Sequence, residues 1–411
     1  MPMVRLDSWK SIADYLERSA RTVQRWHACH GLPVHHLGGC KGSVFAYAEE
    51  IDRWLMSLAQ ENRLGDVGID DALAARKSKS REFVLRAHEM WESRSEESLH
   101  TIAGLYRKAI EQNPVNVEAL TGLANAMISA VLHGVMDGAI AYPAATEALR
   151  RTAQLNADEV DARCAAAWIM LVHERKARQA RAVFDDVLAR HPDRSFALGG
   201  MALSHVLEGD LEGARAWIWR AWRKNTLVPV LGALVCWIEY LAGANTAALD
   251  MAEQMRISGG TGGTLAIIES LALIQEDPSA ARHKRIAALA SEFPQCPTLQ
   301  CALAYDFAVS GKPARAQEIQ AAVEAMNPQK KRSNAYGMAL MAMGLGNDTD
   351  AIRWLETSYE EGSLWSLALR FDPILAPLRE DPRFQALLRK CGFADGVSTH
   401  SGHLELISRA G

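Results

Sequence analysis

Apolar residues recur at helical spacing along most of the chain, in stretches of about 12–16 residues that turn signals separate. The signals Gly209-Asp210, Gly243-Ala244, Asp277-Pro278, Gly311-Lys312 and Gly346-Asn347 follow one another at 34, 34, 34 and 35 residues. Each apolar stretch is long enough for one helix, and two helices in every 34 residues are typical of a solenoid of αα-hairpins. The pattern therefore predicts a mostly α fold.

Small residues mark where the paired helices of this solenoid cross. With repeats expected to begin near Ser195, Pro229, Gly263, Pro297 and Lys331, the crossing position of the first helix holds Ala202, Cys236, Ser270, Ala304 and Met338. The second helix holds Ala214, Ala248 and Ala316, and Arg282 breaks that series. Small side chains let helix axes approach closely. We expect about eight hairpins between residues 81 and 361.

The segment 105–127, LYRKAIEQNPVNVEALTGLANAM, resembles the junction between two tetratricopeptide repeats (TPRs). Tyr106, Ala109 and Pro114 occupy the aromatic, small and closing-proline positions of that repeat, and Ala124 takes the small position of the next. Residues 369–392 resemble the capping segment that often closes bacterial TPR arrays. The resemblance implies a TPR-like domain over 81–392, followed by a flexible tail at 393–411.

One position of the 34-residue repeat predicts a binding surface. It holds Leu203, Trp237, Leu271, Tyr305 and Ala339. In TPR phasing these residues line the concave face, where they would form a groove for a peptide or a partner helix. If the phase is wrong by one residue, the same side chains belong to the core.

The first 59 residues predict a separate small domain with a helix–turn–helix and a wing. Ile12, Ala13 and Leu16 form the apolar face of a first helix, and Val23 and Trp26 form that of a second. Ser19 is expected to cap the second helix. The strings 32–36 and 43–47 favour strands around a glycine-rich tip, and a third helix follows. Trp9, Trp26 and Trp54 are expected to build the core.

The charge of this head differs from that of the whole chain. The protein has a net charge of −4, whereas residues 1–48 carry six Arg or Lys against three acids. Arg21, Gln24 and Arg25 face outward from the second helix, and these side chains read guanine and adenine in the major groove. The head is therefore predicted to bind double-stranded DNA.

The ordered set I-A-x-Y-L-x-x-S-x-R-T-V-Q-R-W, G-L-P-V and Y-x-x-E-I-D-x-W-L resembles the winged-helix heads of MerR-like and excisionase-like regulators. It is similar in particular to bacterial heads fused to TPR arrays. The resemblance implies a recognition helix with Arg21, Thr22, Gln24 and Arg25 and a basic wing. The candidate DNA contacts are Arg18, Ser19, Arg21, Thr22, Gln24, Arg25, His35, His36 and Lys41.

Composition indicates the class of protein and its cellular location. Hydrophobic residues make up 49% of the chain and charged residues 23%, a globular balance. Seven scattered cysteines favour reduced thiols, and the charged start of the chain is unlike a signal peptide. The longest apolar stretch, 227–238, is too short to span a membrane. The sequence predicts a cytoplasmic protein without a membrane partner, with a linker at 60–80 between the two domains.

Three other motifs can be interpreted either as functional sites or as ordinary structural features. The histidines and cysteines between His27 and Cys40 could ligate a metal, but their spacing matches no closed zinc motif. The run 258–264 is glycine-rich but lacks the lysine of a phosphate-binding loop. The tryptophans in 216–222 could form a ligand platform or a hairpin core. No catalytic motif is found, so we expect no enzyme, metal or cofactor.

These observations predict a DNA-binding transcriptional regulator whose TPR-like body binds a protein or senses an effector. The alternative is a TPR scaffold whose head is an adaptor that does not bind DNA. Glu17 and Arg18, at a turn where this type of head favours other residues, keep that alternative open. A homodimer is possible, because regulators of this type usually pair.

Overall fold

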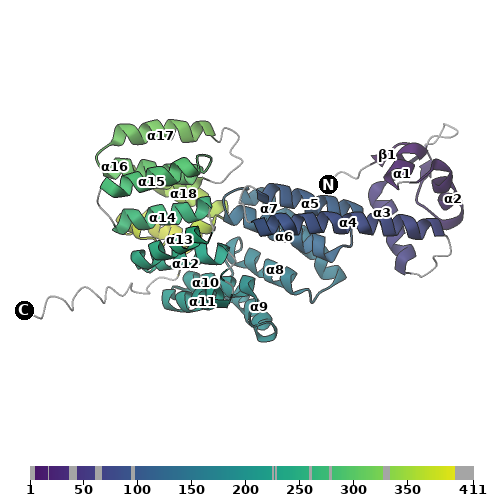
Figure 1. Ribbon diagram of the computed structural model, residues 1–411, viewed down its shortest axis with the longest axis horizontal. Coiled ribbons are helices and arrows are strands. Elements are labelled where there is room, and N and C mark those ends of the chain that lie inside the picture. Colours follow the sequence, from purple (N-terminus) through teal and green to yellow (C-terminus); the bar gives the residue numbers. More distant parts are fainter. Residues whose placement is uncertain are drawn as a thin grey trace, which may run out of the picture. The chain divides into compact units, whose positions relative to one another are not determined.

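The computed structural model describes residues 5–16, 18–36, 44–60, 67–93, 98–224, 226, 229–258, 262–276, 280–326 and 334–393 (Figure 1). Most of them are helical. The chain divides into two compact units: Met1–His88 with Gly104–Ala119, and Glu89–Ala103 with Leu120–Gly411.

The head, in the first unit, has the predicted order of elements. It contains β1 (Arg5–Leu6), α1 (Trp9–Tyr15), α2 (Ala20–His30), β2 (His35–His36), β3 (Val44–Tyr47) and α3 (Ala48–Gln60). The Ser19 side chain accepts a hydrogen bond from the Thr22 N–H at 3.2 Å, which confirms it as the cap of α2. Gly31, with φ 67°, ends that helix in the left-handed conformation.

Apolar faces of all three helices meet in the core of the head. Ile12, Val23, Trp26 and Ile51 are fully buried. Trp54 packs against Trp26 with ring centroids 6.0 Å apart, and Trp9 is a partly buried neighbour of the same cluster. The predicted tryptophan core is therefore present, with Trp26 at its centre.

The sheet of the head has three antiparallel strands in the order β1-β3-β2. Arg5 pairs with Tyr47, and His35 pairs with Phe45. The predicted strand at 32–36 is shorter than expected, and β1 was not predicted because two residues show no alternation. The tip of the expected wing, 37–43, lies outside the described residues.

A long helix, α4 (Val67–Ser93), replaces most of the predicted linker at 60–80. One face of α4 is buried at helical spacing through Arg76, Ser80, Val84 and Ala87. It packs on α5 (Leu99–Gln112), where the Ser80 hydroxyl donates to the Ala109 carbonyl oxygen at 2.8 Å. The linker prediction fails because half of this buried face is polar, so hydrophobic periodicity does not reveal it.

The second unit is built from helix pairs stacked one upon another, as Figure 1 shows for α10 to α18. Its helices are α6 (Val117–Leu132), which begins at the end of the first unit, α7 (Gly138–Leu155), α8 (Val160–Val172), α9 (Ala177–Arg190), α10 (Ser195–Glu208), α11 (Leu211–Lys224), α12 (Pro229–Leu241), α13 (Asn245–Ile257), α14 (Gly263–Glu276), α15 (Ala280–Glu292), α16 (Pro297–Val309), α17 (Pro313–Met326), α18 (Ala335–Gly344) and α19 (Asp348–Glu360). We call this unit the body.

The predicted 34-residue repeat is confirmed by the first residues of four helices. α10, α12, α14 and α16 begin at Ser195, Pro229, Gly263 and Pro297. The turns after them contain Gly209, Gly243 and Gly311 at φ 87°, 75° and 76°. Only glycine adopts this conformation without strain, so these glycines set where each hairpin turns. α18 begins later than expected, at Ala335.

The helix-crossing positions are also confirmed. Ala202, Cys236, Ser270 and Ala304 are fully buried. Arg282, which breaks the second series, is buried. Its charge is paired, because its Nε atom lies 2.7 Å from the Asp306 carboxylate. Since Asp306 is itself fully buried on α16, an ion pair takes the place of the usual small side chain.

The chain after α19 does more than cap the last hairpin. It forms the 3-10 helices η2 (Leu364–Leu367) and η3 (Pro373–Leu378), and then α20 (Pro382–Lys390). η2 contacts α10 as well as α19, and η3 contacts α14. The segment therefore turns back along the body. Phe393, expected to begin the flexible tail, is buried, and 394–411 lie outside the described residues.

No helix in the described part of the chain is both long enough and apolar enough to cross a membrane.

Candidate functional site

The stripe predicted to line an open groove is covered. Leu203 and Leu271 are fully buried, as is Ala339, and Trp237 is 1% exposed. Tyr305 is half-buried. The prediction that these side chains form an accessible surface is therefore wrong, and their burial agrees with the alternative that they belong to the core.

At Trp237 the cover comes from residues 362–378, which we call the return segment. The Trp365 ring stacks on Tyr336 at a centroid distance of 5.0 Å and meets Trp237 edge-on at 5.8 Å. The Tyr240 and Tyr336 hydroxyls each donate to one carboxylate oxygen of Asp372, both at 2.5 Å. One aromatic and one acidic side chain of the return segment are thus held by α12 and α18.

Two further contacts hold the start of the return segment. The Tyr142 hydroxyl donates to the Gly362 carbonyl oxygen at 3.1 Å, and the Arg175 guanidinium donates to the Ser366 hydroxyl. Arg175 has φ 59°, a left-handed conformation that strains any residue other than glycine.

The electrostatics of the covered face are dominated by burial. Burial raises the pKa of Asp372, although hydrogen bonds from Tyr240 and Tyr336 act in the opposite direction. Burial and the nearby Asp372 charge raise the pKa of both tyrosine hydroxyls. A carboxyl group is therefore held here at a desolvation cost that the hydroxyls only partly offset.

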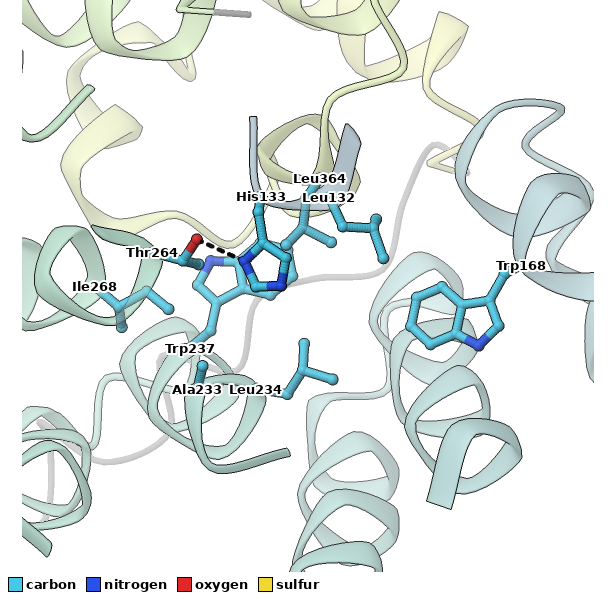
Figure 2. Close-up of a pocket in the computed structure, with 9 residues that line it drawn as sticks. All are labelled: Leu132, His133, Trp168, Ala233, Leu234, Trp237, Thr264, Ile268 and Leu364. Atoms are coloured by element: carbon cyan, nitrogen blue, oxygen red, sulfur yellow. Dashed lines mark hydrogen bonds between the residues drawn. The ribbon is translucent and has the colours of Figure 1, made fainter. Parts of the chain in front are cut away.

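Beside the return segment lies a small apolar recess (Figure 2). Its lining residues are Leu132, His133, Trp168, Ala233, Leu234, Trp237, Thr264, Ile268 and Leu364. Its polar contact is between His133 Nδ1 and the Thr264 hydroxyl, at 3.0 Å. Because Leu364 belongs to the return segment, the recess is what remains of the concave face next to Trp237.

The outward face of α2 has the exposure that was predicted for it. Arg21, Gln24 and Arg25 are exposed, and Thr22 and Arg18 are half-buried. The Ser19 and Thr22 hydroxyls lie 2.8 Å apart and belong to the helix cap. The exposed guanidinium groups are compatible with DNA contact, and that contact stays a prediction.

The two wing histidines are engaged within the head. His35 Nε2 lies 2.6 Å from a Glu50 carboxylate oxygen, and its ring stacks on Phe45. The His36 ring lies 5.8 Å from that of His27. Within the described ranges no cluster of three His, Cys, Asp or Glu could hold a metal, and Lys41 and Cys40 lie outside those ranges.

Sequence reasoning missed a buried arginine that joins the head to the first helix pair. The Arg76 guanidinium on α4 lies 3.1 Å from the Asp52 carboxylate on α3 and 5.2 Å from the centroid of the Tyr15 ring on α1. It also donates to the carbonyl oxygens of Glu111 and Gln112, at 2.9 and 3.0 Å. Arg76 therefore bonds both to the head and to the end of α5.

The surroundings of Arg76 are strongly desolvated. Burial raises the pKa of Tyr15 to about 12, and the Asp52 charge acts in the same direction. Burial also raises the pKa of Asp52, although Arg76 and the Tyr15 hydroxyl oppose the shift. The one sequence signal for this site is an arginine on a face whose other buried positions are small or apolar.

The remaining motifs have structural roles in the repeats. Trp222 is buried, and the Trp219 ring N–H donates to the buried Glu239 carboxylate at 2.7 Å. In the glycine-rich run, Ser258 ends α13 and Gly263 begins α14, whereas 259–261 lie outside the described residues.

No protein-family model matches the chain, and no curated protein matches its sequence. Solved structures are similar to it at low identity. PilW, a widely conserved type IV pilus biogenesis factor, is 16% identical, with a TM-score of 0.39 over 52% of this chain and 94% of its own. The human IFIT1 dimer with PPP-AAAA is 11% identical, with a TM-score of 0.48 over 76% and 84%.

Yeast Tom70 is 12% identical, with a TM-score of 0.43 over 84% of this chain and 81% of its own. These neighbours are TPR-repeat proteins, and at such identities the likeness concerns the fold alone. The 34-residue spacing, the glycine turns and the paired helices make the body a TPR-like solenoid.

Proposed function

We propose that the body is a protein-interaction scaffold, with a binding rather than a catalytic role. The observation that carries the proposal is the return segment, a stretch of the chain that packs on α12 and α18 through specific side-chain contacts. Trp365 and Asp372 bind there through ring contacts and hydrogen bonds. Stacked helix pairs create extended concave surfaces that suit such contacts.

Selection of displayed random peptides on the immobilised full-length chain tests this proposal. Bound peptides should protect backbone amides of α6 to α19 from hydrogen exchange. Selection that yields no binding peptide, or only peptides that protect the head, would contradict a scaffold role for the body.

A second candidate function, DNA binding by the head, is favoured by the accessible guanidinium groups on α2. Arg21 and Arg25 are exposed on a capped helix that is amphipathic, with Gln24 between them. Arginine reads guanine and glutamine reads adenine from such a helix in the major groove. A head that binds DNA on a body that binds protein would act as a transcriptional regulator.

Fluorescence anisotropy with random-sequence duplex DNA, measured across a salt series, tests the second candidate. The unmodified chain should bind with a log–log salt slope of roughly −0.9 per phosphate contacted. Replacing Arg21 and Arg25 by Ala should weaken binding and make that slope less steep by about 2. The matched control is Arg81→Ala with Arg86→Ala, two exposed arginines of α4. Equal binding by both double variants would favour the adaptor alternative.

A further inference from the structure

The return segment indicates which chemistry the concave face recognises. Its Trp365 indole lies against Trp237 and Tyr336, and seven residues later its Asp372 carboxyl lies between the Tyr240 and Tyr336 hydroxyls. Tyr336 contributes to both contacts. Because these side chains come from α12 and α18, helices of different repeats build one composite site.

Asp372 caps η3 and also bonds to two helices of the body. It is 3% exposed, and its carboxyl accepts from two tyrosine hydroxyls and, at 3.2 Å, from the Ile374 N–H. Burying a carboxyl group costs free energy that an apolar side chain of similar size would not cost. The tyrosine pair, together with the Ile374 N–H, supplies the hydrogen bonds that a buried carboxyl group needs at this position.

The backbone contacts of the return segment are also less favourable than those of a regular α-helix. Its regular parts are two 3-10 helices, whose hydrogen bonds are poorer than those of an α-helix. Arg175, which donates to Ser366 at its start, has the strained φ of 59°. These features distinguish it from the regular α-helix pairs on which it lies.

Buried apolar side chains lie between the two specific contacts and directly after the second. Leu367, Leu369 and Leu375 are fully buried, and Ile374 is 2% exposed. A polypeptide that takes the place of the return segment must supply similar apolar residues, because the side chains that Trp365 contacts, Trp237 and Tyr336, are themselves buried rings.

We propose that the concave face around α12, α16 and α18 is a binding site for a partner polypeptide that carries a tryptophan and, seven residues later, a carboxylate side chain within an apolar sequence. The return segment occupies this site as an internal substitute for the partner. The inference rests on the proposed scaffold function. Since the internal segment competes at a high effective concentration, partners bind weakly until it is displaced.

A synthetic peptide with the sequence of residues 361–380, labelled with a fluorophore, tests the proposal on the full-length chain. Replacing Trp365 and Asp372 by Ala in the protein should loosen the return segment. This opened variant should bind the peptide at least roughly tenfold more tightly than the unmodified chain. Adding Tyr240→Phe and Tyr336→Phe should reduce that affinity roughly tenfold, through loss of two hydrogen bonds.

Two controls separate the inference from the scaffold function. Tyr106→Phe, which changes a buried tyrosine of the first unit, should leave the affinity unchanged. Peptides in which Trp365 or Asp372 is replaced by Ala should bind much more weakly than the parent peptide. If they bind equally well, the face binds polypeptides but the proposed recognition is wrong. If the folded opened variant binds no peptide, the scaffold role of this face fails as well.

Hydrogen exchange of the unmodified chain gives a second test that needs no variant. Excess parent peptide should accelerate exchange of the backbone amides in the return segment while those of α12 stay protected. The peptide with Asp372 replaced by Ala should have little effect. Unchanged exchange at peptide concentrations that saturate the opened variant, or at millimolar peptide if that variant does not fold, would overturn the proposal.

Discussion

The α2 face of the head is predicted from helical spacing within one helix and the stripe of the body from the 34-residue repeat, yet one is exposed and the other is covered. Arg21 and Arg25 are exposed, whereas Leu203 and Trp237 are buried. The elements that bury the other face of α2 are close to it in the sequence. The segment that covers the stripe follows the last helix pair. Spacing in the sequence predicts a shared face in both cases, but exposure depends on what else the chain places there.

The largest expected effect comes from Trp237→Ala, which tests whether the stripe is now part of the core. Trp237 is 1% exposed and contacts Trp365, so its removal should lower the free energy of unfolding by about 3–5 kcal/mol. Urea unfolding measures the loss. Trp91→Ala, at a tryptophan that is 37% exposed, is the control and should cost much less. Equal costs would mean that the stripe is accessible after all.

Next in size is Arg76→Ala, which tests how firmly the head is joined to the first helix pair. The change removes the ion-pair partner of Asp52, to which the Tyr15 hydroxyl still donates, and leaves two carbonyl oxygens without their donor. We expect a loss of about 2–3 kcal/mol, because the Asp52 side chain keeps 16% of its exposure and water can reach it. Differential scanning calorimetry of Arg76→Ala beside Arg81→Ala checks this. A loss no larger than that of the control would contradict the structural role of Arg76.

The contrast between these regions also shows what sequence can and cannot predict. The helix starts at Ser195, Pro229, Gly263 and Pro297 were predictable because glycine turns and an exact repeat fix them locally. The cap at Ser19 was predictable for the same reason.

Contacts between residues far apart in the sequence were not predictable. The polar face of α4 looks like a linker because Arg76 and Ser80 are buried through bonds to α5 carbonyl groups. The partners of Asp372 lie on α12 and α18, and no spacing in the sequence links the three residues. Both sites depend on polar side chains buried by distant elements, and hydrophobic patterns carry no information about them.

The smallest expected effect is a pH dependence at Asp372. The groups that face it are Tyr240 on α12, Tyr305 on α16, Tyr336 on α18 and Arg379 at the end of η3. Burial raises the folded-state pKa of Asp372 above its ordinary value, so its protonated form favours the folded state. That stabilisation is complete below the ordinary pKa and is lost as the pH rises through the raised folded-state pKa.

Urea unfolding of the unmodified chain and of Asp372→Asn across acidic to neutral pH measures this effect. The stability of the unmodified chain should fall relative to the variant as the pH rises, by about 1.4 kcal/mol for each unit of pKa shift. A constant difference across the pH range would mean that burial does not control this carboxyl group.

Hydroxyl-radical footprinting of the unmodified, full-length chain tests the central claim most directly, namely that the chain's own return segment covers the concave face. Trp237, Tyr240 and Tyr336 should be modified far more slowly than the exposed Trp91. They should become reactive when Trp365 and Asp372 are replaced by Ala. Rapid modification of Tyr240 and Tyr336 in the unmodified chain would show that the return segment does not cover this face.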